Sequence, residues 1–250
     1  MGLSQLSALS DTRRHVPRIP TDYSTYLGRE WELFAGDPGR QDESRALARH
    51  FAPRRVLDVG CGGGQDLIPF AEHGATCVGI DVARESALWA TRQFQCELPG
   101  TSAAFLTGAA EALPFGDGSF DLVICRLAIP YTNNAAAFAE MSRVLTDGGG
   151  LLLKTHTPNY YLRKFWTGVR TGAPLFSVHA ARVLVSGLVY HVTGRQPAGG
   201  ILLQEVFQTR HNLHKELARV NLRIERELTD STPQTRGYVI TKRQAAVSAR

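Results

Sequence analysis

Residues 56–66 read VLDVGCGGGQD, an apolar run that ends in an acid and then breaks into glycines at every second position. The apolar run predicts a buried strand, and the glycines predict a sharp turn into a helix that begins near Gly64. Glycine suits such a turn because it adopts backbone angles that other residues avoid, and because it lets a ligand approach the main chain closely. The stretch therefore predicts a nucleotide site on an α/β fold.

The spacing of the glycines separates the nucleotide classes that use such a turn. The dinucleotide fingerprint GxGxxG has its last glycine at the sixth position, and counting from Gly60 this position is Gln65. A phosphate loop ends in Gly-Lys-Ser or Gly-Lys-Thr, and no such ending follows here. The turn therefore fits neither class.

A second buried strand that ends in an acid is predicted at residues 76–81, TCVGID. Rossmann-type folds place at this point a carboxylate that binds the ribose hydroxyls. Between the two strands, residues 66–74 predict a short helix with Pro69 in its first turn and Gly74 at its end. The strands and the helix form a βαβ unit.

The glycine turn resembles motif I of the class I S-adenosylmethionine methyltransferases. Residues 108–125, GAAEALPFGDGSFDLVIC, are similar to the GDAExLPFxDxSFDxV segment of the methyltransferase type 11 family. Residues 136–155, with EMSRVL at 140–145 and DGGG at 147–150, match the helix, glycine turn and fifth strand of that family. The resemblance covers residues 52–156.

This resemblance implies a Rossmann-like, seven-stranded, mostly parallel sheet with helices on both faces, and S-adenosyl-L-methionine as the cofactor. Asp58 would brace the turn and Asp81 would bind the ribose. The family usually has an acid at Ala109 that accepts a hydrogen bond from adenine, so its loss here costs about 1 kcal/mol of cofactor binding. The cofactor-binding residues implied are Asp58, Gly60, Cys61, Gly62, Gly64, Asp81, Val82, Ala110, Glu111, Cys125 and Arg126.

The chain divides into four predicted segments. Residues 1–51 form a tail and lid helices, in which Tyr23, Tyr26 or Trp31 contacts the cofactor or substrate, or simply packs in the core. Residues 52–155 form the cofactor-binding core. Residues 156–208 form an inserted, mainly helical substrate cap, since an insertion after the fifth strand starts at the ligand-binding edge of the sheet. Residues 209–250 close the core with a helix at 209–220, capped by Thr209, and antiparallel strands at 222–228 and 237–242.

The composition of the chain limits which kinds of protein it can be and in which cellular compartment we expect it. The chain has 250 residues, of which 43% are apolar, enough for a substantial core. The four cysteines form no CxxC pair, so we expect no metal site, no disulfide and a reducing compartment. There is no apolar segment typical of a secretory signal before Arg13, and the apolar run at 183–190 is too short to span a bilayer. We therefore expect a cytoplasmic protein with no membrane span.

Charge is unevenly distributed along the chain. Residues 1–150 carry 13 Lys and Arg against 18 Asp and Glu, whereas residues 151–250 carry 15 against 5. A basic cap favours a methyl acceptor that carries phosphate or carboxylate. A solvated, arginine-rich surface is an equal alternative.

Methyl transfer from a sulfonium is a direct displacement, so the enzyme aligns the reactants, excludes water and removes a proton from some acceptors. His156 is the first candidate for a catalytic base because it follows the fifth strand directly and titrates near neutral pH. A loop histidine bonded to nearby backbone is an equal alternative. Lower-ranked candidates are His179, His191, Tyr160 and Tyr161.

Three functions remain open. Enzymes that methylate planar amines typically carry Asn/Asp-Pro-Pro-Tyr/Phe after the fourth strand, and residues 125–128 read CRLA instead. We therefore favour O- or C-methylation of a small molecule, akin to enzymes of quinone, lipid or secondary-metabolite pathways. The alternatives are a nucleic-acid or protein methyltransferase that uses the basic cap, and a protein that binds the cofactor without catalysis. Nucleic acid is disfavoured because no RNA-binding module is recognisable, and the oligomeric state is not predicted.

Overall fold

The computed structural model describes residues 22–197, 205–228 and 234–244. The strands are β1 (Arg55–Val59), β2 (Thr76–Asp81), β3 (Ala103–Thr107), β4 (Phe120–Arg126), β5 (Leu145–His156), β6 (Leu222–Leu228) and β7 (Thr235–Lys242). The helices are α1 (Asp22–Ala35), α2 (Pro38–Phe51), α3 (Ile68–Glu72), α4 (Arg84–Glu97), α5 (Asn134–Val144), α6 (Pro158–Thr171), α7 (Pro174–Thr193) and α9 (Arg210–Arg219), with 3-10 turns η1 (Gln65–Leu67) and η2 (Ile129–Tyr131).

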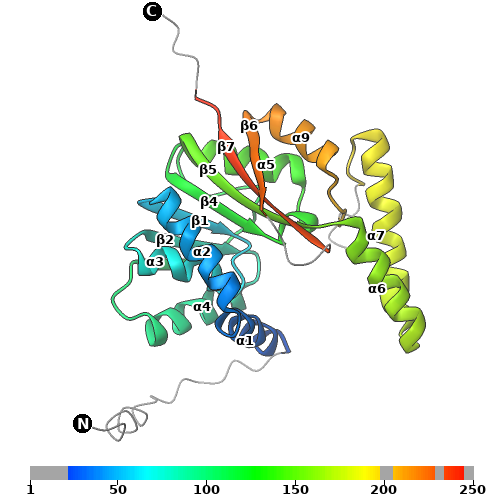
Figure 1. The fold of residues 1–250 in the computed structure, drawn as a ribbon, viewed down its shortest axis with the longest axis horizontal. Coiled ribbons are helices and arrows are strands. Elements are labelled where there is room, and N and C mark those ends of the chain that lie inside the picture. The colour runs from blue at the N-terminus through cyan, green and yellow to red at the C-terminus, as the bar shows by residue number, and fades with distance from the viewer. Residues whose placement is uncertain (1–21, 198–204, 229–233, 245–250) are drawn as a thin grey trace, which may run out of the picture.

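The strands form one sheet in the order β3-β2-β1-β4-β5-β7-β6, with helices on both faces (Figure 1). Strands β1 to β5 are parallel, and β7 runs antiparallel to its neighbours β5 and β6. The predicted Rossmann-like, mostly parallel sheet is therefore confirmed.

Alternate residues of the central strands enter two hydrophobic cores, one on each face of the sheet. On one face, Leu57 and Leu151 pack with Phe138 of α5 and Leu213 of α9. On the other face, Val56, Leu122 and Leu152 pack with side chains of α2, α3 and α4. The central strands β1, β4 and β5 contain runs of buried apolar residues because both of their faces are covered.

Several local predictions agree with the structure. Helix α9 begins after Thr209, whose side chain accepts a hydrogen bond of 3.3 Å from the backbone N–H of Asn212. The helix predicted at 66–74 begins as the 3-10 turn η1 and continues as α3, with Pro69 in its first turn. Strand β5 starts earlier than expected, because Leu145 pairs with Phe120 before the ladder shifts to Gly150 opposite Leu122.

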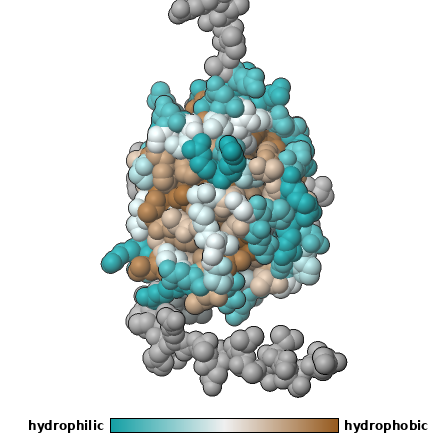
Figure 2. Space-filling view, turned by 90° about the vertical axis from the view of Figure 1, so that its left-hand side faces the viewer, coloured by the Kyte–Doolittle hydropathy of each residue, from teal (hydrophilic) through white to brown (hydrophobic). Residues whose placement is uncertain are grey.

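The segment after β5 forms an antiparallel helical hairpin, α6 and α7, which lies beside the sheet (Figure 1). Its inner face contains Tyr161, Ala180 and Val183, packed against Phe207. The surface on the opposite side of the molecule, around β3 and α3, carries polar and apolar residues intermixed (Figure 2). The four-segment division of the chain stays a prediction.

Candidate active site

A first cavity of about 410 Å³ lies at the carboxyl ends of the parallel strands. This volume is within the range of about 300 to 1,000 Å³ that is usual for ligand pockets. Its walls come from helix α1, the turn after β1, the ends of β2 and β3, and the segment after β4. The lining residues are Tyr23, Tyr26, Gly60, Gly62, Asp81, Val82, Gly108, Ala109, Ala110, Glu111, Arg126, Leu127, Ala128, Tyr131 and Thr132.

Gly60 shows why the turn after β1 needs glycine. Its φ angle is +73°, and a Cβ on this residue would collide with the Cβ of Ala128. The backbone N–H groups of Gly60 and Cys61 both donate to the carbonyl of Ile80, at 2.8 and 3.2 Å. The turn is thus packed between β2 and the segment after β4, and its backbone forms the floor of the cavity.

Asp81 ends β2 and is almost fully buried, with 9% of its surface exposed. One carboxylate oxygen accepts from the backbone N–H of Gly62 and the other from that of Ala83, both at 2.9 Å. The carboxylate therefore holds the glycine turn in position at the wall of the first cavity. It lies where the sequence predicts a ribose-binding acid.

A buried ion cluster lies beneath the turn. Asp66 Oδ1 is 3.0 Å from Arg40 Nη2 and 3.4 Å from Arg126 Nε. Burial raises the pKa of Asp66, but the two guanidinium groups outweigh it, so this pKa is lowered. Burial, followed by the negative charge of Asp66, instead raises the pKa of Asp58 well above its ordinary value. Asp66 thus carries the negative charge of this cluster, and Asp58 is buried in β1.

A second cavity of about 290 Å³ adjoins the first and shares Tyr26, Gly60, Gly62, Arg126 and Leu127 with it. Both signs of charge line it: three carboxylates and three basic groups. This mixture suits a zwitterionic ligand, since each end of an amino acid then meets an opposite charge. The charged lining residues are Glu30, Asp37, Asp66, Arg40, Arg126 and Lys154.

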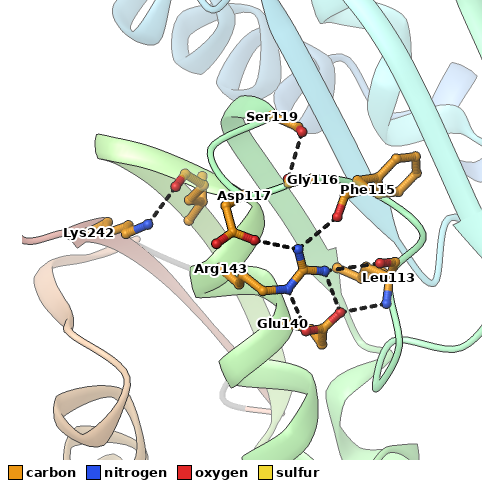
Figure 3. Close-up of polar contacts among 9 residues, drawn as sticks. Leu113, Phe115, Gly116, Asp117, Ser119, Glu140, Arg143 and Lys242 are labelled. Atoms are coloured by element: carbon orange, nitrogen blue, oxygen red, sulfur yellow. Dashed lines mark hydrogen bonds and ion pairs between the residues drawn. The ribbon is translucent and has the colours of Figure 1, made fainter.

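The loop between β3 and β4 is held against α5 by Arg143 and Glu140 (Figure 3). The guanidinium of Arg143 donates to the carbonyls of Phe115 at 2.7 Å and Leu113 at 3.0 Å. It also pairs with Glu140 at 2.7 Å, and Glu140 accepts from the backbone N–H of Leu113 at 2.8 Å. These contacts fix the loop whose first residues line the first cavity.

Tyrosines gather at the side of the first cavity that faces the hairpin. Tyr131 of η2 lines the cavity, and its pKa is raised by burial and then by the charge of Glu205, with smaller effects of Tyr160 and Tyr26. Tyr160 belongs to α6. Tyr23 and Tyr26 of α1 and Tyr131 of η2 therefore build this wall of the first cavity.

Glu205 joins the hairpin to the core and was not found from the sequence. Its carboxylate is 3% exposed and accepts from the hydroxyl of Tyr161 at 3.0 Å. It also lies 2.8 Å from His179 Nε2 and 3.3 Å from Arg182 Nη2. No local pattern signals this role, because the partners come from two helices distant in sequence. The lower-ranked candidates His179 and Tyr161 thus belong to this cluster.

His156 stands at the end of β5 with 8% of its surface exposed. Its ring stacks on that of Tyr160, with centroids 3.9 Å apart and planes 11° apart. Burial, and then the charges of Lys164 and Lys154, lower its pKa from 6.5 to about 4. Its Nδ1 is buried and has no hydrogen-bond partner among the described residues. His156 is thus a neutral imidazole stacked on Tyr160, and it does not line either cavity.

The structure brings most of the predicted cofactor residues together. Among them, Gly60, Gly62, Asp81, Val82, Ala110, Glu111 and Arg126 line the first cavity, and Cys61 lines the second. Asp58, Gly64 and Cys125 line neither cavity. A Cβ on Gly64 would lie 2.7 Å from the ring of Phe105, so the packing at this position requires glycine.

The aromatic residues predicted in the lid are expected either to contact the ligand or to pack in the core, and the structure places residues at the first cavity as well as in the core. Tyr23 and Tyr26 line the first cavity, whereas Trp31 packs edge-on against Trp89 and Phe94 in the core. The described residues contain no group of three or more His, Cys, Asp or Glu placed to hold a metal ion. The four cysteines are free thiols.

Comparisons with known proteins define the class. A family model described as a methyltransferase domain matches residues 57–153. A Bacillus subtilis protein named as an uncharacterized methyltransferase is 37% identical over 106 residues, 42% of each chain. A demethylmenaquinone methyltransferase of Roseiflexus castenholzii is 33% identical over 168 residues, 66% of this chain and 69% of that one. The structure of magnesium protoporphyrin IX methyltransferase from Synechocystis has a TM-score of 0.58 at 18% identity, covering 88% of this chain and 96% of that one.

The fold and the site are therefore those of a Rossmann-like methyltransferase domain. More particularly, the chain belongs to the S-adenosylmethionine-dependent methyltransferases, since it aligns with more than two thirds of the Roseiflexus castenholzii enzyme. The cofactor of this family is S-adenosylmethionine. The chain covers 42% of the Bacillus subtilis relative and 61% of an uncharacterized methyltransferase of Synechocystis.

Proposed function

We propose that the protein transfers the methyl group of S-adenosylmethionine to an oxygen or carbon atom of a small molecule. The observation that carries this proposal is the pair of adjoining cavities around Gly60 and Gly62. One has an acid at the end of β2 for the ribose, and the other has the mixed charge that an amino-acid group needs. Together they match the chemistry of an adenosyl group joined to methionine.

Individual residues then take the following roles. Asp81 accepts hydrogen bonds from the ribose, while backbone groups at Ala110 and Glu111 contact adenine. Arg40 and Arg126 attract the carboxylate of the methionine part, and the glycine turn lets the cofactor approach the main chain closely. The bound cofactor supplies a methyl group on a sulfonium, which is already activated toward displacement.

The acceptor is proposed to lie between α1, η2 and the hairpin, where Tyr26 and Tyr131 face the first cavity. These side chains position the acceptor and exclude water, which favours direct displacement. His156 is the proposed base, because it is neutral at pH 7 and its Nδ1 has no partner among the described residues. Since it lines neither cavity, this role requires Tyr160, on which it stacks, to move when the acceptor binds. The basic residues of the α6–α7 segment favour an acceptor that carries phosphate or carboxylate.

The name of the Roseiflexus castenholzii relative, demethylmenaquinone methyltransferase, supports a small-molecule acceptor. We also propose that the protein acts in the cytoplasm, since its four cysteines are free thiols.

Calorimetry with S-adenosylmethionine and with its demethylated product tests cofactor binding. The native protein is expected to bind both. The Asp81→Asn variant should bind about ten- to hundredfold more weakly, because a charged hydrogen-bond acceptor is lost. The matched control is Asp147→Asn, whose carboxylate is 55% exposed. If the folded native protein binds neither ligand, the proposed function is wrong.

Methyl transfer itself is tested with labelled cofactor and a metabolite extract of the host. Label should appear in small molecules rather than in protein or nucleic acid. The His156→Gln variant is expected to retain cofactor affinity and to lose most of the turnover. Turnover close to the native rate would contradict the assignment of His156 as the base.

A further inference from the structure

We infer that the tip of the α6–α7 hairpin docks the protein on the surface of an anionic lipid membrane. We define the hairpin tip as the last two turns of α6, the connection at residues 172–173 and the first two turns of α7. In Figure 1 this tip is the end of the hairpin that lies farthest from β6 and α9. The inference goes beyond the proposed methyl transfer and rests on different residues.

The hairpin tip exposes large apolar side chains. Trp166 and Val169 of α6 are 55% and 53% exposed, and Leu175, Phe176 and Val178 of α7 are 81%, 53% and 65% exposed. Scattered apolar residues are normal on protein surfaces, but a group of this kind within four helical turns marks an interaction site. The apolar surface also continues along α7, through Val185, Leu188, Val189 and Val192.

Charge indicates which partner covers this surface. Residues 157–197 contain no Asp or Glu, but they include Arg163, Lys164, Arg170, Arg182 and Arg195. Arg163 and Arg170 are exposed on α6, seven residues apart and therefore on one side of the helix, next to Leu162 and Val169. An exposed apolar face bordered by basic residues is typical of helices that lie in the interface of anionic membranes.

The same charge pattern argues against a second copy of the chain as the partner. Two such hairpins would bring basic residues together without any acid from either hairpin to pair with them. Like charges across an interface oppose association. Lipid phosphates supply the complementary charge, and the acyl chains accept the apolar tip.

The hairpin lies on the membrane rather than crossing it. Among the described helices, α7 alone has the length and apolar composition that a membrane span would need. However, Ala180, Val183 and Tyr190 on its other side are buried against the protein, and the hydroxyl of Tyr190 donates to Glu216 of α9. This buried side keeps α7 attached to the core, so only its outer face is available to lipid.

Vesicle co-sedimentation tests the inference. Vesicles of phosphatidylglycerol and phosphatidylcholine in equal amounts should carry the native protein down, and more salt should weaken the binding. Vesicles of phosphatidylcholine alone should bind on the order of tenfold less. The fluorescence of Trp166 should move to shorter wavelength on binding, and Trp166→Phe should remove most of that change.

Two pairs of variants separate the contribution of apolar insertion to vesicle binding from the contribution of charge. Leu175→Asp with Val178→Asp should lower binding on the order of tenfold or more, whereas Leu88→Asp on α4, also exposed, should leave it unchanged. Arg163→Glu with Arg170→Glu should abolish the preference for anionic vesicles. Arg49→Glu with Arg223→Glu changes the net charge equally outside the hairpin and should preserve that preference. Unchanged cofactor affinity shows that each variant is folded.

Three outcomes would overturn the inference. The first is a folded, cofactor-binding native protein that stays in the supernatant with anionic vesicles. The second is equal vesicle binding by the native protein and by the variant with Leu175→Asp and Val178→Asp. The third is a native dimer that this variant converts to a monomer in sedimentation equilibrium, because the hairpin tip would then be a contact between copies. None of these outcomes depends on whether methyl transfer occurs.

Discussion

Gly60 combines two constraints on a single residue, a positive φ angle and a close approach to Ala128. We expect Gly60→Ala to lower the free energy of unfolding by about 2 kcal/mol or more, through backbone strain and overpacking. It should also abolish cofactor binding, because the turn must move. Urea denaturation and calorimetry measure these two effects.

The control for this variant is Gly100→Ala. Gly100 has a φ of +88°, but no atom lies within 4 Å of the position of its Cβ. This variant therefore carries the backbone strain without the collision. If both variants bind the cofactor equally well, the close packing of the turn against Ala128 is not needed for the site.

At the residue scale, the burial of His156 also makes the free energy of unfolding depend on pH. Its pKa is lowered from 6.5 to about 4 by burial and by the nearby lysines. In this range the unfolded chain binds a proton at His156 and the folded protein does not. The free energy of unfolding therefore decreases as the pH falls from 6.5 to 4, by up to about 3 kcal/mol from this residue.

The His156→Gln variant has no imidazole at this position, so its free energy of unfolding should fall less over the same pH range. Urea denaturation at a series of pH values compares the two slopes. Parallel curves for the native protein and the variant would show that His156 is not buried as a neutral group.

At the scale of elements, α5 holds the loop between β3 and β4 through Arg143. Arg143→Ala removes its hydrogen bonds to two backbone carbonyls and its pair with Glu140. We expect the free energy of unfolding to fall by about 1 to 3 kcal/mol and cofactor binding to weaken, since the loop lines the first cavity. Arg143→Lys should recover little, because an ammonium cannot reproduce the planar donor array.

Chemical denaturation and calorimetry test this prediction, with Arg49→Ala as the control, since Arg49 is an exposed arginine on α2. Equal cofactor affinity for Arg143→Ala and the native protein would mean that the loop keeps its shape without α5.

At the scale of the whole molecule, the cofactor should stabilise the sheet as one unit, since β1, β2, β3 and β4 all end at the first cavity. At a ligand concentration about a hundredfold above Kd, the free energy of unfolding rises by about 3 kcal/mol. For a chain of this size, the midpoint of thermal unfolding then rises by about 5 to 10 °C. Differential scanning calorimetry with the demethylated product measures this shift. The Gly60→Ala variant should show none, and an equal shift in that variant would place the ligand elsewhere.

The position of the glycine turn, the acid at the end of β2 and the class of cofactor follow from the sequence alone. The reason is physical: buried parallel strands are continuous apolar runs, and a tight turn under a ligand needs glycine at set positions. Thr209 as a helix cap is similarly local, because its partner lies three residues away.

Only the tertiary structure decided the ion cluster of Arg40, Asp66 and Arg126, the carboxylate of Glu205 between two helices, and the exposed tip of the α6–α7 hairpin. Each of these depends on which side chains the packing of distant elements buries, and a local pattern carries no information about that. The sequence by itself thus determined the class of the cofactor. The tertiary packing decided how the site is braced and which surface of the hairpin is left exposed.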